Sequence, residues 1–176
     1  MLKKSLFLII CITLLSAFAI PEKLEKKADK VISKFYETED FLKTPVQVSG
    51  SLNEATPSHF GKDNFFVISS EGKELGYGYI GNAPSKTATF DYLVLFDNDF
   101  IITKSKVLIY REEYGGEIGS KRWLQQFDGA SAASEELVYN QDIIPISGAT
   151  ISVRSMTKAM NDLLKSIAVL QKKEAL

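Results

Sequence analysis

An apolar stripe through the last part of the chain constrains the fold more than any other feature of the sequence. From about Thr150 to Leu170, apolar side chains recur at three- and four-residue spacing. This spacing predicts one long helix with a single buried face, made of Met156, Ala159, Met160, Leu163, Leu164, Ile167 and Leu170. The charged residues Arg154, Lys158 and Lys165 fall elsewhere on that helix.

Strand patterns dominate the middle of the chain. Apolar or alternating runs cover residues 65–68, 75–80, 90–96 and 100–110, and turn-forming residues separate them. An amphipathic pattern over residues 22–37 predicts a helix before the strands, and residues 38–62 are expected to have little regular structure. The class is therefore α+β: an antiparallel sheet packed with an N-terminal helix, a short middle helix and the long C-terminal helix.

The short middle helix follows the last strand pattern. Ser120 is a suitable N-cap, the helix continues through Trp123 and Phe127, and Gly129 lies beyond its end. After a surface loop, Leu137–Tyr139 is expected to form an edge strand.

The N-terminus has the pattern of an export signal. Lys3 and Lys4 precede an apolar run from Leu6 to Ile20, and Ala17-Phe18-Ala19 fits a signal-peptidase site. The run is short for a membrane-spanning helix, which needs about 20 apolar residues, although an uncleaved anchor is the alternative. We expect a signal peptide at 1–19, a helix and connecting segment at 20–62, and one functional domain at 63–176. The expected location is the periplasm or the outer side of the cytoplasmic membrane.

Composition excludes several classes of function. The formal net charge is −1 at pH 7, so the chain lacks the basic character typical of nucleic-acid binding. Cys11, the only cysteine, lies within the expected signal. A disulfide, a thiol nucleophile and a cysteine metal site are therefore not expected in the exported protein. His59 is the single histidine, and we interpret it as a solvated loop residue rather than a metal ligand.

The most informative segment directly precedes the long helix. It consists of small and hydroxyl-bearing residues: Ser147, Gly148, Ala149, Thr150, Ile151 and Ser152. A helix N-terminus presents unpaired N–H groups and the positive end of the helix dipole, so this segment can hold a phosphate. On residue chemistry alone, an ordinary Ser or Thr cap preceded by glycine explains the same pattern.

Two motifs together resemble the bacterial FMN-binding domain family. Ser147-Gly148-Ala149-Thr150 is similar to the S-G-A-T motif of that family. Upstream, Tyr114-Gly115-Gly116-Glu117-Ile118, followed by Trp123 and Phe127, is similar to its G-G-E segment. The family includes subunits of the sodium-translocating NADH:quinone reductase and of the Rnf electron-transport complex, and the resemblance covers roughly residues 65–170.

The resemblance implies a cofactor and its attachment. In the family, a flavin transferase esterifies the phosphate of flavin mononucleotide (FMN) onto the threonine that matches Thr150. Residues 147–152 would hold the phosphate, while Gly115, Gly116 and Glu117 would line the flavin. One departure concerns attachment: Ile144 stands where modified members often carry an acid, and the nearest acid is Asp142. FMN binding is implied in either case, with a covalent bond at Thr150 and non-covalent binding as the two forms.

Some further residues are weaker candidates. Lys86 and Arg154 could pair with a phosphate, although solvated positions explain both residues as well. Tyr77, Tyr79 and Tyr92 could stack on a ring, but strand tyrosines more often cover the core. A backbone role is expected for Gly115 and Gly116, where a Cβ would obstruct the conformation or a close approach.

Three functions remain open on the sequence. An electron carrier comes first, because the mature chain has no redox centre of its own and FMN would supply one. Its partners would be the flavin transferase and a membrane or periplasmic redox protein. The second is a flavin-dependent reductase of a small exported substrate, with Glu117 as the only proton donor near the motifs. The third is a binding module that has kept the fold and lost the flavin.

Overall fold

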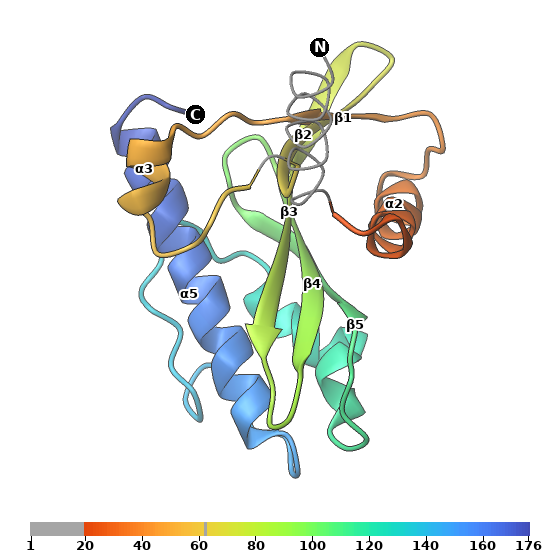
Figure 1. Cartoon of the computed structure of the whole chain (residues 1–176), viewed down its shortest axis with the longest axis vertical. Coiled ribbons are helices and arrows are strands. Elements are labelled where there is room, and N and C mark those ends of the chain that lie inside the picture. Colours follow the sequence, from red (N-terminus) through yellow and green to blue (C-terminus); the bar gives the residue numbers. More distant parts are fainter. Residues whose placement is uncertain (1–19, 62) are drawn as a thin grey trace, which may run out of the picture.

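The computed structural model describes residues 20–61 and 63–176, which form three layers. A five-stranded antiparallel sheet lies between α2 (Glu22–Tyr36) and α5 (Thr150–Lys172), as Figure 1 shows. The expected signal at 1–19 lies outside the described residues. Within the described part of the chain, no helix has both the length and the hydropathy needed to cross a bilayer.

The sheet is a simple meander in which each strand pairs with its sequence neighbours. Its order is β1-β2-β3-β4-β5, formed by β1 (Leu42–Pro45), β2 (Phe65–Ser70), β3 (Lys73–Pro84), β4 (Thr89–Phe96) and β5 (Ile102–Ile109). The register shifts between Ile68 and Ser69, opposite Gly76 and Glu74. The backbones of β3 and β4 come very close beside this irregularity, since a Cβ on Gly76 would lie 2.1 Å from the Phe96 carbonyl oxygen.

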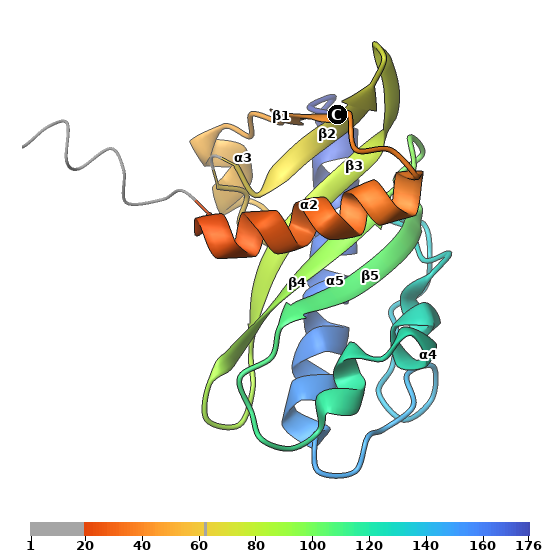
Figure 2. The same ribbon diagram turned by 90° about the vertical axis from the view of Figure 1, so that its right-hand side faces the viewer.

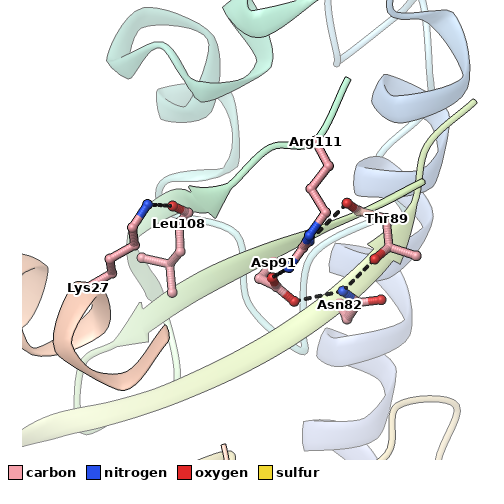
Figure 3. Close-up of polar contacts among 6 residues, drawn as sticks. All are labelled: Lys27, Asn82, Thr89, Asp91, Leu108 and Arg111. Carbon is pink, nitrogen blue, oxygen red and sulfur yellow. Dashed lines mark hydrogen bonds and ion pairs between the residues drawn. The ribbon is translucent and has the colours of Figure 1, made fainter. Parts of the chain in front are cut away.

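α2 covers one face of the sheet. Leu24, Ala28 and Ile32 are buried at helical spacing, so one stripe of the helix contacts the sheet as the sequence predicts. Their partners on the sheet are Phe66, Ile68, Ile80, Leu93, Leu95 and Leu108. The Lys27 side chain also donates a 3.0 Å hydrogen bond to the Leu108 carbonyl, which ties α2 to β5 (Figure 3).

α5 and the short helices cover the opposite face, as the turned view in Figure 2 shows. The predicted stripe is buried except for the half-buried Ala159. Each large apolar side chain that is fully buried contributes about 1.5–3 kcal/mol, so this helix is firmly fixed against the sheet. The short helices are η1 (Gly116–Gly119), α4 (Lys121–Leu124) and η2 (Gln125–Phe127), with Ser120 as the expected N-cap.

The structure departs from the sequence predictions in three places. The segment expected to lack regular structure contains β1 and α3 (Gly50–Glu54). β3 continues to Pro84 rather than ending near Ile80. Leu137–Tyr139 is not a strand, because its only ladder contact is an isolated bridge between Tyr139 and Ile143. β1 depends on pairing with β2, more than 20 positions away in the sequence, which local sequence patterns do not encode.

Candidate functional site

The first turn of α5 has unpaired backbone donors. Its N-cap is Ala149, and no side chain accepts a hydrogen bond there, so the alternative of an ordinary Ser or Thr cap is wrong. The first helical bond runs from the Val153 N–H to the Ala149 carbonyl at 2.9 Å. The N–H groups of Thr150, Ile151 and Ser152 have no acceptor among the described residues. A helix start in this state attracts an anion.

Two glycines shape the approach to this helix. Gly148 has φ +76° and Gly115 has φ +78°, a region that favours glycine. A Cβ on Gly115 would lie 2.4 Å from the Cβ of Ala149, so the two sequence motifs are in direct contact at these residues. Gly116 differs, since a Cβ there meets nothing within 4 Å. The prediction that a Cβ would be obstructed by neighbouring protein atoms is therefore confirmed for Gly115 and wrong for Gly116.

Tyr110 connects the same two segments by hydrogen bonds. Its hydroxyl donates to the Tyr114 carbonyl at 3.1 Å and shares a 3.1 Å hydrogen bond with the Ser152 hydroxyl. Ser152 is buried in the first turn of α5. The strand exit, the glycine loop and the helix start are thus held as one unit.

The segment before the helix is anchored by the short middle helix. The Trp123 indole N–H donates to the Ile144 carbonyl at 2.8 Å, and the Ile144 N–H donates to the Gln126 side chain at 2.7 Å. Ser120 accepts a hydrogen bond from the Trp123 N–H, which fixes the start of α4. These bonds determine the path of the chain toward Ser147.

An ion pair between the exposed Arg111 and the buried Asp91 fixes the chain where it leaves β5. Arg111 pairs with the Asp91 carboxylate and donates to the Thr89 carbonyl, while Asn82 donates to Asp91 and to the Thr89 hydroxyl (Figure 3). Because neighbouring residues of an extended chain point in opposite directions, anchoring Arg111 also orients Tyr110 and Glu112.

A pocket of about 380 Å³ opens at the start of α5. It is lined by Lys86 from the β3–β4 turn, by Tyr110, Glu112 and Tyr114 after β5, and by residues 148–152. Its volume lies in the range of small-molecule sites. Lys86 adds a cation to the positive end of the helix dipole, so the pocket attracts negative charge from two directions.

Glu112 faces this pocket, but its carboxylate is occupied by the neighbouring turn. It accepts from the Thr87 N–H at 2.7 Å, the Thr87 hydroxyl at 2.8 Å and the Ala88 N–H at 3.1 Å. The nearby Ser85 hydroxyl and then the Thr87 groups hold the pKa of Glu112 at about 2. The Ser85 Oγ lies outside hydrogen-bond geometry, so we attribute the anchoring mainly to Thr87 and Ala88. Glu112 thereby holds the turn that carries Lys86.

The predicted site residues divide into two groups. Gly148, Ala149, Thr150, Ile151 and Ser152 line the pocket, and Gly115 packs against its wall at Ala149. Ser147, Gly116 and Glu117 are exposed and do not line it.

The weaker candidates also separate. Lys86 reaches the pocket, whereas the Arg154 guanidinium lies over the Tyr139 ring, 4.7 Å from its centroid. Tyr79 and Tyr92 are buried in the core, where burial raises the pKa of Tyr79 to about 12. Asp142 accepts a hydrogen bond from the Val138 N–H within its own loop and does not reach the pocket.

Sequence reasoning missed Tyr110 and Glu112 as pocket residues. Both directly follow β5, at the same end of the sheet as the β3–β4 turn. Their position after a strand and just before the glycine loop was the available signal.

Comparison with known proteins identifies a family whose model matches the part of the chain that carries this site. Residues 87–165 match the family model of the FMN-binding domain, a span that contains β4, β5, the short helices and the first turns of α5. No curated protein matches the chain. The match agrees with the resemblance seen in the two motifs, and the matched residues include most of the pocket. Residues 87–165 therefore belong to the FMN-binding domain family, and FMN is the cofactor of this domain.

Proposed function

We propose that this protein is an exported electron carrier whose FMN is attached through its phosphate to Thr150. The observation that carries the proposal is the uncapped start of α5, where three unpaired N–H groups and the Thr150 hydroxyl meet a pocket that Lys86 also lines. A phosphate group needs hydrogen-bond donors and positive charge, and this pocket offers both.

The residues present fit an FMN phosphate. The N–H groups of Thr150, Ile151 and Ser152 would donate to its oxygens, and Lys86 would balance its charge. Gly148 leaves open space where a Cβ would stand, so the phosphate can approach the backbone. Tyr114 is 75% exposed at the pocket, which leaves an aromatic surface for the flavin ring.

Thr150 is a suitable acceptor for covalent attachment. It is exposed, so a flavin transferase can reach its hydroxyl. Its side chain makes no cap hydrogen bond, so esterification would disturb no existing contact of the helix start. Ile144, which is 65% exposed, stands where modified family members often have an acid, so the experiment below tests the covalent bond directly.

FMN would supply the redox chemistry, and the protein would bind and orient it. The carrier role is favoured over a reductase, because a reductase needs a proton donor beside its substrate. Among the residues that the structure describes, Glu112 is the only one with a carboxyl side chain that lines the pocket, and its hydrogen bonds to Thr87 and Ala88 keep it ionised. Glu117 is exposed away from the pocket. Export rests on the N-terminal pattern of Lys3, Lys4 and Ala17-Phe18-Ala19.

The test uses the full chain produced in a bacterium together with a flavin transferase. Intact mass should show a protein that has lost its signal and gained the mass of FMN less one water. A denaturing gel under ultraviolet light should show a fluorescent band for wild type. Thr150→Ala and Thr150→Val should lose the band, and Thr150→Ser should retain part of it.

Two outcomes would contradict this function. A fluorescent band that persists in Thr150→Ala would place the bond on another residue. A yellow native protein that loses its colour on denaturation would mean that FMN is held without a covalent bond. Ser147→Ala is the matched control, because it removes a neighbouring hydroxyl that is exposed outside the pocket.

A further inference from the structure

A second hollow lies between α2 and α4, across the outer strand β5. Its volume is about 560 Å³, larger than that of the pocket at the start of α5, and the two hollows share no lining residue. In Figure 2, β5 runs between α2 and the short helices that follow it, so three elements form the walls. We refer to this hollow as the α2–α4 groove.

Lysines surround the α2–α4 groove. They come from all three walls: Lys30, Lys34, Lys104, Lys106 and Lys121. None of them takes part in an ion pair among the described residues, although the chain forms ion pairs elsewhere. Lys106 donates to the Gly119 carbonyl at 3.3 Å, and the Lys104 ammonium lies 5.8 Å from the centre of the Phe35 ring.

One acid offsets this charge only in part. Asp128 lines the groove, and no lysine of residues 20–61 or 63–176 lies within ion-pair distance of its carboxylate. Burial raises the pKa of Asp128, while Lys104 and Lys121 act to lower it. Five ammonium groups and one carboxylate leave the groove strongly positive, which favours an anion over a neutral occupant.

The lining of the groove also offers apolar surface. Val31 and Phe35 from α2 are half-buried, and the buried Leu124 lines the groove from α4. Ser105 is only 5% exposed and its Oγ is enclosed by protein atoms, so the surface that a ligand can reach consists of the lysines and the apolar side chains.

We propose that the α2–α4 groove binds a small organic anion with an apolar body. The anionic head would contact the lysines, and the body would cover Val31 and Phe35. A concave site with an apolar floor and a few convergent polar groups is the usual form of a small-molecule site. The site is separate from the flavin pocket, so it does not depend on the proposed electron-carrier function.

The test uses calorimetric titration of the flavin-loaded full protein with decyl phosphate, kept below its micelle concentration. Inorganic phosphate and phosphatidylglycerol vesicles serve as parallel probes. Decyl phosphate should bind, inorganic phosphate should bind more weakly, and the vesicles should not retain the protein. Wild type binding decyl phosphate no more tightly than inorganic phosphate would overturn the apolar part of the site. Retention on vesicles without binding of decyl phosphate would overturn the small-molecule assignment in favour of a membrane surface.

Charge-matched variants locate the binding. Lys34→Gln combined with Lys104→Gln should weaken decyl phosphate binding about tenfold. Each lost charge accounts for on the order of half of the corresponding change in binding free energy. Lys172→Gln with Lys173→Gln removes two exposed lysines outside the groove and should leave the affinity unchanged. Equal weakening in both double variants would overturn the proposal, because it would mean attraction to net charge alone.

Discussion

The two hollows of this protein attract negative charge by different means. At the start of α5, the positive charge comes from backbone N–H groups held by the helix, and Lys86 is the one lysine in the described part of the chain that lines the pocket. In the α2–α4 groove, the charge comes from five lysine side chains on three separate elements. The first arrangement is rigid before a ligand arrives, whereas the second must order long side chains around the ligand.

This difference bears on how tightly and how selectively each hollow can hold an anion. Fixing a lysine side chain costs up to about 2 kcal/mol of conformational free energy, whereas a helix N–H is already in place. The α5 pocket is therefore suited to one group in one position, as an attached cofactor requires. The α2–α4 groove is suited to reversible binding of a ligand that can vary.

The largest effect should come from breaking the rigidity of the first site. Gly115→Val combines a positive φ with a Cβ that would lie 2.4 Å from the Ala149 Cβ. We expect it to lower the free energy of unfolding by about 3 kcal/mol and to reduce flavin content. Gly116→Val is the matched control, expected within about 0.5 kcal/mol of wild type. Chemical denaturation and flavin absorbance measure both effects, and equal losses in the two variants would contradict the contact between the motifs.

Ionic strength should affect ligand binding differently in the two hollows. Raising the ionic strength from about 0.01 M to about 1 M shortens the Debye length from about 30 Å to about 3 Å. Decyl phosphate binding in the α2–α4 groove should weaken about tenfold or more over this range. Flavin bound covalently at Thr150 should be unaffected, and FMN held without the covalent bond should be affected less than decyl phosphate. Calorimetry and flavin absorbance follow the two sites, and a similar salt dependence at both would remove the distinction.

Gly148→Ala should cost less than the change at Gly115. Its φ of +76° is unfavourable for alanine, although a Cβ would meet nothing within 4 Å. We expect a loss of about 1 kcal/mol in the free energy of unfolding. The new methyl group would stand in the space left for the phosphate, so non-covalent FMN affinity should fall more than stability does. Full FMN affinity in this variant would mean that the phosphate does not approach the backbone at Gly148.

The smallest effect should come from Glu112. Its pKa is lowered from 4.5 to about 2 in the folded protein, so its contribution to stability is complete above pH 4.5 and is lost as the pH falls toward about 2. Glu112→Gln should remove this part of the acid sensitivity, and Glu113→Gln should not. Hydrogen exchange at the Thr87 and Ala88 amides, measured across that range, reports the effect. Unchanged protection of these amides in Glu112→Gln would show that the carboxylate does not hold the turn.

The helices and the central strands could be predicted because their patterns are local. The stripe of α5 and the cap at Ser120 depend on residues within a few positions of one another, and the structure confirms both. β1 could not be predicted in this way, because Leu42 is exposed and the strand is defined by pairing with β2. Its stability comes from a neighbour more than 20 positions away in the sequence.

In the candidate site, too, the features set by neighbouring residues could be predicted, and those set by distant contacts could not. The start of α5 was visible in the sequence because glycine, hydroxyl residues and a helix start lie together there. Glu112 was not, because its role comes from Thr87 and Ala88 across the β3–β4 turn. Gly115 and Gly116 look equivalent in the sequence, and the positive φ of Gly115 and its packing against Ala149 separate them.

The order of the elements along the chain also determines when the pocket can form during synthesis. The pocket at the start of α5 takes residues from the β3–β4 turn, from the end of β5 and from the start of α5, and the ribosome delivers these in that sequence. A nascent chain that stops before residue 150 contains the residues of all five strands but lacks the helix start that completes the pocket. Under the proposed function, cofactor loading would have to wait for this last helix to dock, and a flavin on Thr150 would mark a chain whose synthesis and folding had passed that point.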